Sequence, residues 1–251
     1  MNIDTSEQSQ LEKFSRYEFK YVLNSQTRKH IEDEISHFMR YDGHVHPELK
    51  NRYFVRSLYF DNDLYSHYHE KTDGIRSRKK FRMRTYGREF QEGVPIYFEM
   101  KGRHIDRTYK HRVAIDFDHI PLFQDPKQVF QLLDIYPNNW LIEQFVYDTL
   151  RKHIKPCVLI DYLRRPYTSD YDMNFRLTFD DSLNACPSSE LFYNDPNSWR
   201  QCISGYCILE VKFHRRIPAW FHKVIQANDL RRRSISKFCE GIEYCGLADE
   251  S

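Results

Sequence analysis

One segment, GIRSRKKFRMRTYGR from Gly74 to Arg88, limits the structures available to this chain more than any other. In a β-strand, alternate side chains point to opposite sides of the sheet. One face of this segment would carry Arg76, Arg78, Lys80, Arg82 and Arg84. The other face would carry Ser77, Lys79, Phe81, Met83 and Thr85. Cations stacked this closely repel one another, so the charged face must meet either water or a polyanion.

The same alternation recurs in five further segments. Their charged faces carry Glu18 and Lys20; Glu99, Lys101 and Arg103; Lys110 and Arg112; Arg176 and Asp180; and Glu210 and Lys212. Their opposite faces are large and apolar, with residues such as Phe19, Phe98, Phe117, Phe179 and Phe213. This pattern is typical of half-buried antiparallel strands.

Two arrangements would accommodate these charged faces. They could face bulk water, which is the usual fate of one polar strand face. Alternatively, the sheet could close into a barrel with its charges inside and helices covering its apolar outer surface, which would also remove the sheet edges. The charged faces of all six segments consist largely of Arg, Lys and Glu, and this recurrence favours the second arrangement. We therefore predict an α+β fold: an antiparallel β-barrel tunnel with a charged lumen and helices packed on the outside.

Composition limits the class of protein. The 251 residues suit one large domain or two small ones, and the net charge of +2 excludes a uniformly basic nucleic-acid binder. No apolar run is long enough for a transmembrane helix, and the polar N-terminus does not resemble a signal peptide. We expect a cytoplasmic protein with a flexible lead at 1–15, a single domain at 16–246 and a tail at 247–251. The run Arg231 to Arg233 is interpreted as a solvated loop outside the site.

The six cysteines form no CxxC pair, and no histidines stand at zinc spacing, so we interpret them as reduced thiols. The predicted helices are Ser25 to Arg40 with Ser25 as N-cap, Asp125 to about Tyr136, Asn139 to His153, a helix from Pro218, and Ser234 to Tyr244. Val158 to Leu163 is predicted as a strand, and Ser182 to Ser198 as a loop.

Seven motifs, in order, resemble one known family. They are RYEFKY, SLYFDN, KFRMRTYG, FEMKGR, RLTFDD, LEVKF and SISKF, spread between Arg16 and Gly246. Together they resemble the VTC domain, the polyphosphate-polymerase module of the vacuolar transporter chaperone complex, which also occurs as soluble bacterial proteins. That family belongs to the triphosphate tunnel metalloenzymes, with the CYTH proteins. Its eukaryotic members carry a phosphate-sensing domain and membrane helices that this sequence does not contain, so we expect no membrane translocation by this chain alone.

The resemblance implies a tunnel that binds ATP and polyphosphate. The matching catalytic positions are Lys20, Arg82, Arg84, Lys101 and Glu210. Substrate-binding positions are Arg56, Lys80, Lys110, Arg112, Arg164, Arg165, Arg176, Lys212 and Lys237; between Lys110 and Arg112, and between Arg164 and Arg165, the match leaves the choice open. Glu210, then Glu18 and Glu99, would bind Mn²⁺ or Mg²⁺, which prefer carboxylate and phosphate oxygens. The implied activity is transfer of the γ-phosphate of ATP to a growing polyphosphate chain.

Other interpretations stay open at this point. Glu18 with Lys20, Glu99 with Lys101, and Glu210 with Lys212 could be structural ion pairs, and Asp180 and Asp181 could bind metal or cap a turn. The same tunnel could hydrolyse tripolyphosphate or nucleoside triphosphates, or bind polyphosphate without catalysis. RNA binding predicts aromatic side chains beside the cations. Since the large aromatic residues alternate with the cations, we expect no nucleic-acid partner.

Overall fold

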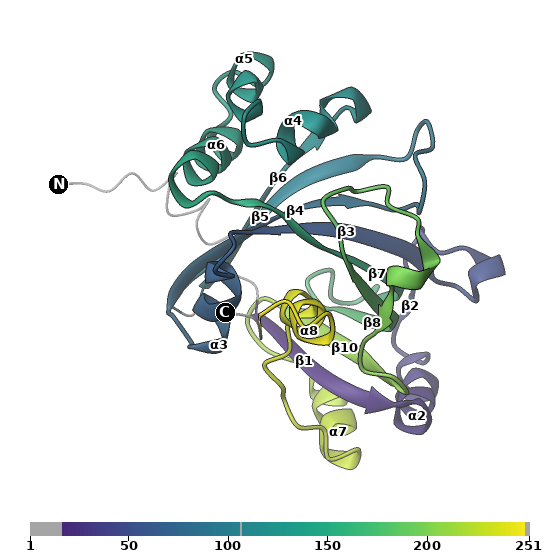
Figure 1. Ribbon diagram of the computed structural model, residues 1–251. Helices are drawn as coiled ribbons and strands as arrows, with labels where there is room; N and C mark the ends of the chain where they lie inside the picture. The colour runs from purple at the N-terminus through teal and green to yellow at the C-terminus, as the bar shows by residue number, and fades with distance from the viewer. Residues whose placement is uncertain (1–16, 106, 249–251) are drawn as a thin grey trace.

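The computed structural model describes residues 17–105 and 107–248, and one antiparallel sheet organises them (Figure 1). The predicted lead at 1–15, Arg16 of the first motif and the last three residues lie outside this range. The strands are β1 (Tyr17–Asn24), β2 (Arg40–Tyr41), β3 (Tyr53–Asp61), β4 (Ser77–Thr85), β5 (Ile96–His104), β6 (Arg107–Ile115), β7 (Lys155–Thr168), β8 (Arg176–Pro187), β9 (Arg200–Gln201) and β10 (Tyr206–Phe213).

The sheet curls but does not close. Its order is β1-β10-β8-β7-β3-β4-β5-β6, with β2 paired to β7 and β9 paired to β8. Within the described residues, the two end strands, β1 and β6, do not pair with each other, so the expectation of a closed barrel was wrong. The register of β7 shifts opposite β3 and again opposite β8, where Ser182 has a φ of 54°. Such bulges increase the local twist and help the sheet to curl around a concave face.

Most helices cover the convex face, as predicted. They are α4 (Ile120–Gln124), α5 (Leu132–Ile135) and α6 (Trp140–Lys152) over one arm of the sheet, and α2 (Ser25–Ile35) and α7 (Ala219–Ala227) over the other (Figure 1). Phe145 of α6 packs against Phe81 of β4 and Phe98 of β5, with ring centroids 5.3 and 4.6 Å away. The apolar positions of the alternating strands therefore form the core between sheet and helices.

Helix α8 (Lys237–Tyr244) is an exception, because it packs on the concave face. Its Phe238 contacts Tyr59, which faces the cavity described below, at 5.2 Å between ring centroids. Gly241 allows the close approach, since a Cβ there would lie 2.8 Å from Cδ1 of Ile160. The prediction that all helices lie outside was wrong for this one. A further helix, α3 (Ser66–Thr72), packs against β3, β4 and α8.

Local signals explain where several elements begin. The side chain of Asn139 accepts hydrogen bonds from the backbone amides of Leu141 and Ile142, which confirms the predicted start of α6. In α2 the N-cap is Asn24, not Ser25, because the Asn24 side chain accepts from the Thr27 amide at 2.8 Å.

Several predicted boundaries were wrong. α2 ends at Ile35 rather than Arg40, α4 ends at Gln124 where a helix was predicted to begin, and β8 continues through the predicted loop as far as Pro187. β7 is also longer than the predicted Val158 to Leu163. All six cysteines are free thiols. No helix in the described part of the chain is long and apolar enough to cross a membrane.

Candidate active site

A cavity of about 710 Å³ occupies the concave face of the sheet. Among the residues that the structure describes, eleven cationic side chains line it, against two carboxylates, Glu18 and Glu210. The cations are Lys20, Lys80, Arg82, Arg84, Lys101, Lys110, Arg112, Arg164, Arg176, Lys212 and Lys237. All eleven belong to the residues singled out in the sequence. We call this space the larger cavity.

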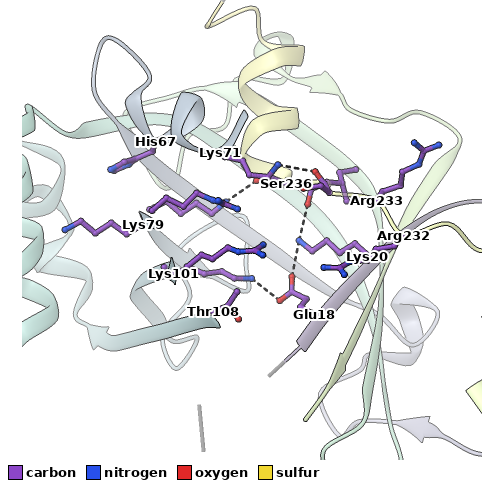
Figure 2. A pocket seen from close by; sticks show the side chains of 16 residues that line it. Glu18, Lys20, His67, Lys71, Lys79, Lys101, Thr108, Arg232, Arg233 and Ser236 are labelled. Carbon is purple, nitrogen blue, oxygen red and sulfur yellow. Dashed lines mark hydrogen bonds and ion pairs between the residues drawn. The ribbon is translucent and has the colours of Figure 1, made fainter. Parts of the chain in front are cut away.

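A smaller cavity of about 470 Å³ continues from the larger one. The two share the lining residues Glu18, Lys20, Lys80, Lys101, Thr108 and Ser236. Figure 2 shows this smaller cavity, where Lys20, Lys101 and Arg232 come from separate segments to surround it. Arg231 to Arg233 form an exposed loop, as predicted. Arg232 and Arg233 nevertheless line this cavity, so the expectation that the run lies outside the site was wrong for these two residues. The segment that contains Arg232 and Arg233 lies along the edge of β1, because the backbone amide of Arg233 donates a hydrogen bond to the carbonyl of Lys20 at 2.8 Å.

Strand alternation places the cations of β4. Lys80, Arg82 and Arg84 line the larger cavity, whereas Phe81 and Met83 between them are fully buried in the core. The neighbouring strand places Lys101 opposite Lys80. Like charges directly opposite each other destabilise a sheet, so the sequence accepts a stability cost to concentrate positive charge at this face.

Glu99 is the buried anion beneath this face. Arg82 approaches its Oε2 at 2.6 Å, and Lys110 forms an ion pair with its Oε1. Burial raises the pKa of Glu99, but Arg82, Arg84 and Lys110 together bring it well below the usual value. Glu99 is 1% exposed and does not line either cavity. It neutralises two tunnel cations and is poorly placed to bind a metal ion.

Glu210 lies among four cations. Its Oε1 lies 2.7 Å from Lys237 Nζ and 3.5 Å from Lys20 Nζ. Its Oε2 lies 3.1 Å from Lys212 Nζ and 3.5 Å from an Arg164 nitrogen. Burial opposes the charge, but these four cations hold the pKa of Glu210 well below its usual value. Glu210 is therefore an ionised carboxylate at the point where β1, β7, β10 and α8 converge.

Asp180 adds a second anion beside Glu210. It pairs with Lys237 at 2.6 Å and accepts two hydrogen bonds from Arg164, at 2.6 and 2.7 Å. Burial alone would lower the pKa of Lys237, but the carboxylates of Asp180 and Glu210 raise it. Lys237 stays charged and is held in place from two sides. Asp181, its neighbour in sequence, instead pairs with Arg28 and Arg52.

Glu18 connects the two ends of the sheet. Its carboxylate lies 3.1 Å from Lys20 on the same strand and 2.9 Å from Lys101 of β5 (Figure 2). β1 is one end strand of the sheet and β5 is the neighbour of the other end strand, β6, so this ion pair spans the open side of the curled sheet. The pKa of Glu18 lies well below its usual value because Lys101 and Lys20 outweigh the effect of burial.

Lys80 and Arg84 have only neutral partners within hydrogen-bond distance in the described chain. Lys80 donates to Ser236 Oγ at 3.1 Å, and Arg84 donates to Ser57 Oγ and the Tyr162 hydroxyl, both at 3.1 Å. Burial lowers the pKa of Lys80 to about 8. Tyr59 lies beside them and accepts from Arg82 at 2.9 Å. Burial raises its pKa, but Arg82, Lys80 and Arg84 lower it to about 7.

Two predicted binding residues face away from the cavities. Arg56 is 2% exposed and pairs with Asp161 through two hydrogen bonds of 2.9 and 2.8 Å on the convex face. Arg165 pairs with Glu32 of α2 at 2.6 Å, so of the alternatives Arg164 and Arg165 only Arg164 lines the cavity. The expectation for Arg56 was wrong, because strand alternation places it on the face opposite Tyr53 and Tyr59, which line the cavity. Arg165 is the rejected one of its two alternatives. Of the alternatives Lys110 and Arg112, both line the cavity.

The sequence interpretation missed the cavity tyrosines. Six tyrosines of the described chain line the larger cavity beside the cations, although the aromatic side chains were expected on the opposite face: Tyr17, Tyr53, Tyr59, Tyr86, Tyr109 and Tyr162. The rings of Tyr59 and Tyr162 lie 5.7 Å from Arg82 and 5.3 Å from Arg164. Applying the alternation to the segment Tyr53 to Asp61 would have assigned Tyr59 to the cavity and Arg56 to the other side.

The carboxylates fit a metal ion shared with a phosphate ligand. No group of three or more His, Cys, Asp or Glu among the described residues is arranged to hold a metal. Mg²⁺ often binds through one or two carboxylates together with substrate phosphates, and keeps several waters. Glu210 and Glu18 line the larger cavity and are the carboxylates able to contribute to such a site.

Solved structures with a similar fold have low sequence identity. A candidate adenylyl cyclase from Hippeastrum, described as having a dominant triphosphatase activity, is 13% identical, with 89% of this chain and 93% of that chain covered and a TM-score of 0.52. A candidate adenylate cyclase from Bacillus halodurans is 12% identical, with 88% and 95% covered and a TM-score of 0.48. The first likeness supports the tunnel fold. No curated protein matches the sequence.

The family comparison covers nearly the whole chain. The model of the VTC domain matches residues 15–245, which include all ten strands and the cationic cavity. The chain belongs to the VTC domain family.

Proposed function

We propose that this protein is a polyphosphate polymerase that transfers the γ-phosphate of ATP to the end of a polyphosphate chain. The observation that carries the proposal is the excess of cations over carboxylates in the larger cavity, eleven against two. In the described chain, the smaller cavity adds Lys71, Arg78, Lys79, Arg103, Arg232 and Arg233. Since the two cavities share lining residues, their cations form one continuous path, which favours a polymeric ligand.

The residues suit phosphoryl transfer. This reaction requires little covalent help from the protein and depends on positioning and on neutralisation of charge. Arg82, Arg84 and Arg164 would hold phosphate oxygens through paired donors, while Lys20 and Lys237 act as point charges. A divalent ion such as Mn²⁺ or Mg²⁺, held by Glu210 with Glu18 and by the phosphates, would neutralise charge on the transferred group.

The bond changes balance without a proton. A terminal oxygen of polyphosphate attacks the γ-phosphorus of ATP, a new P–O bond forms, and the bond from the γ-phosphorus to the β,γ-bridging oxygen breaks, releasing ADP. The attacking oxygen is already ionised, so this reaction needs no general base. Hydrolysis would instead require a water to be activated. In the protein without ligand, Glu18 and Glu210 both pair with lysines. In the proposed complex the metal ion would occupy them instead, so in neither state is a cavity carboxylate free to activate a water, which favours transfer to phosphate.

The test is polyphosphate synthesis by the purified protein with ATP and Mn²⁺ or Mg²⁺. The substitution Arg84→Met removes a cavity cation whose hydrogen bonds go to hydroxyls, so folding should survive. Loss of a charged hydrogen bond to phosphate predicts a fall in synthesis of about 10- to 100-fold. Lys29→Met, an exposed change on α2, is the matched control and should leave synthesis unchanged. Tight polyphosphate binding without turnover under any divalent metal would replace the polymerase with a binding module.

A further inference from the structure

The two cavities offer different surfaces at their far ends. Beyond the shared residues, the described lining of the smaller cavity is dominated by Lys71, Arg78, Arg103, Arg232 and Arg233, without a Tyr, Phe or Trp. The described lining of the larger cavity carries six tyrosines, Tyr17, Tyr53, Tyr59, Tyr86, Tyr109 and Tyr162. Two of them, Tyr53 and Tyr86, contact each other. Tyr53 begins β3 and Tyr86 follows the end of β4, and these strands are antiparallel, so both lie at the same end of the sheet. The smaller cavity lies toward the opposite end of β4, at Arg78 and Lys80.

The two rings form a corner of partly exposed aromatic surface. Their centroids are 5.9 Å apart and their planes meet at 66°. Burial raises the pKa of Tyr53 to about 12 and also raises that of Tyr86, so both hydroxyls are neutral at physiological pH. Within the described chain neither hydroxyl forms a hydrogen bond. Arg84 and Arg164 line the same cavity next to them.

This corner suits a ligand that is not phosphate alone. An inorganic phosphate chain has no flat apolar surface, so cations such as those of the smaller cavity would be enough to bind it. A nucleobase has such a surface, and stacking on an aromatic side chain is available to every base. We propose, on the basis of the polymerase function above, that Tyr53 and Tyr86 hold the nucleoside of ATP. The triphosphate then points along the cations toward the smaller cavity, which receives the polymer.

Stacking without hydrogen-bond readout has a consequence for specificity. The corner supplies faces and neutral hydroxyls rather than a set of donors and acceptors matched to one base. The protein should therefore accept ATP and GTP about equally, and pyrimidine nucleotides less well because their rings are smaller.

The test compares ATP with inorganic tripolyphosphate in binding titrations with divalent metal chelated, so that nothing turns over. Tyr53→Leu and Tyr86→Leu should weaken ATP binding by about 5- to 150-fold while changing tripolyphosphate binding less than about 2-fold. Unchanged tripolyphosphate binding also shows that the variant is folded. Tyr171→Leu, at a residue that is 92% exposed and outside both cavities, is the matched control and should change neither affinity.

Two results would overturn the proposal. Equal weakening of ATP and tripolyphosphate would show that the tyrosines only shape the wall, and unchanged ATP binding in both variants would place the nucleoside elsewhere. Because the readout is binding, it is independent of the polymerase assay. A protein without polymerase activity could still show the contrast, and an active polymerase could lack it.

Discussion

At the scale of single residues, each cavity carboxylate neutralises more than one cation. Glu210 forms ion pairs with Lys237, Lys212, Lys20 and Arg164, and Glu18 forms ion pairs with Lys20 and Lys101. A carboxylate within a polyanion site weakens binding unless it has another role. Here it has two, because it reduces repulsion among the cations of the free protein and provides an oxygen ligand for a divalent ion.

The substitution Glu210→Gln separates these roles. Removing one partner of a buried ion pair leaves the others uncompensated, at a cost of about 3–5 kcal/mol, so the melting temperature of the free protein should fall. Long polyphosphate should restore it, since the ligand supplies the missing charge. Polyphosphate binding should persist or tighten, because one repulsive charge is gone, whereas metal-dependent turnover should be lost. Thermal melts with and without polyphosphate, beside a turnover assay, measure both effects; full turnover would remove Glu210 from the metal site.

Tyr59 and Lys80 predict a pH dependence near neutrality. Tyr59 becomes negative above a pKa of about 7, and Lys80 loses its charge above about 8. The affinity for long polyphosphate should therefore fall from pH 6 to pH 9 at constant ionic strength. In the unfolded chain both groups titrate near 10, so between about 7 and 10 the unfolded state binds more protons, and the free protein should gain stability as pH rises.

Titrations of wild-type protein and Tyr59→Phe distinguish these contributions. The variant should lose the part of the affinity change that comes from Tyr59 and keep the part that comes from Lys80. That second part should move to lower pH than in the wild-type protein, because the Tyr59 charge helps to raise the pKa of Lys80. An affinity that does not change over this range in the wild-type protein would contradict the assignment.

The sequence alone predicted the cavity cations but not which neighbour of each pair faces inward. Alternation is unambiguous within Lys80, Arg82 and Arg84, because the intervening residues include Phe81 and Met83. At Arg164 and Arg165 both residues are cationic, so only the partners, Asp180 and Glu32, decide the face. Arg56 was assigned by its nearness to a motif, whereas its buried partner Asp161 lies far away in sequence.

At the scale of elements, α8 links the core to the cavity. Phe238 and Ile242 are fully buried against the concave face, while Lys237, at the first position of the helix, pairs with Glu210 and Asp180. The preceding Ser236 accepts from Lys80. The apolar contacts of this short helix therefore position two residues that line the larger cavity.

Two phenylalanine substitutions test this link. Phe238→Ala in α8 and Phe145→Ala in α6 both empty a fully buried site, and each should lower the free energy of unfolding by about 3–5 kcal/mol. Only Phe238→Ala should also weaken polyphosphate binding, measured well below both melting temperatures, because it loosens the helix that carries Lys237. Equal binding by both variants would show that α8 does not control the position of Lys237.

Helices and strands with strong periodicity could be predicted from the sequence, but the side on which α8 packs could not. The Ser234 to Tyr244 segment is amphipathic, which indicates one buried face without saying which sheet surface covers it. The concave face was expected to be uniformly charged. Instead, Val55, Ile160 and Ala185 form an apolar area that α8 covers. The prediction of a closed barrel was wrong for a similar reason. Whether β1 pairs with β6 depends on how far the whole sheet curls, which no single segment of the sequence determines.

At the scale of the whole molecule, the curled sheet combines a cation-lined path with an open side. Glu18 and Lys101 bridge that side through side chains instead of a backbone ladder. The path is the feature that the polymerase proposal needs, because both the donor triphosphate and the acceptor chain must lie among the cations at once. A hydrolase would need only the triphosphate.

The most direct test of this account is the phosphate balance of the reaction with ATP and Mn²⁺. The ADP released is measured beside the phosphate recovered as polyphosphate and as orthophosphate. The account predicts that nearly every ADP is matched by one phosphate in polyphosphate, with little orthophosphate. Recovery of the transferred phosphate as orthophosphate alone would contradict it and identify the tunnel as that of a hydrolase.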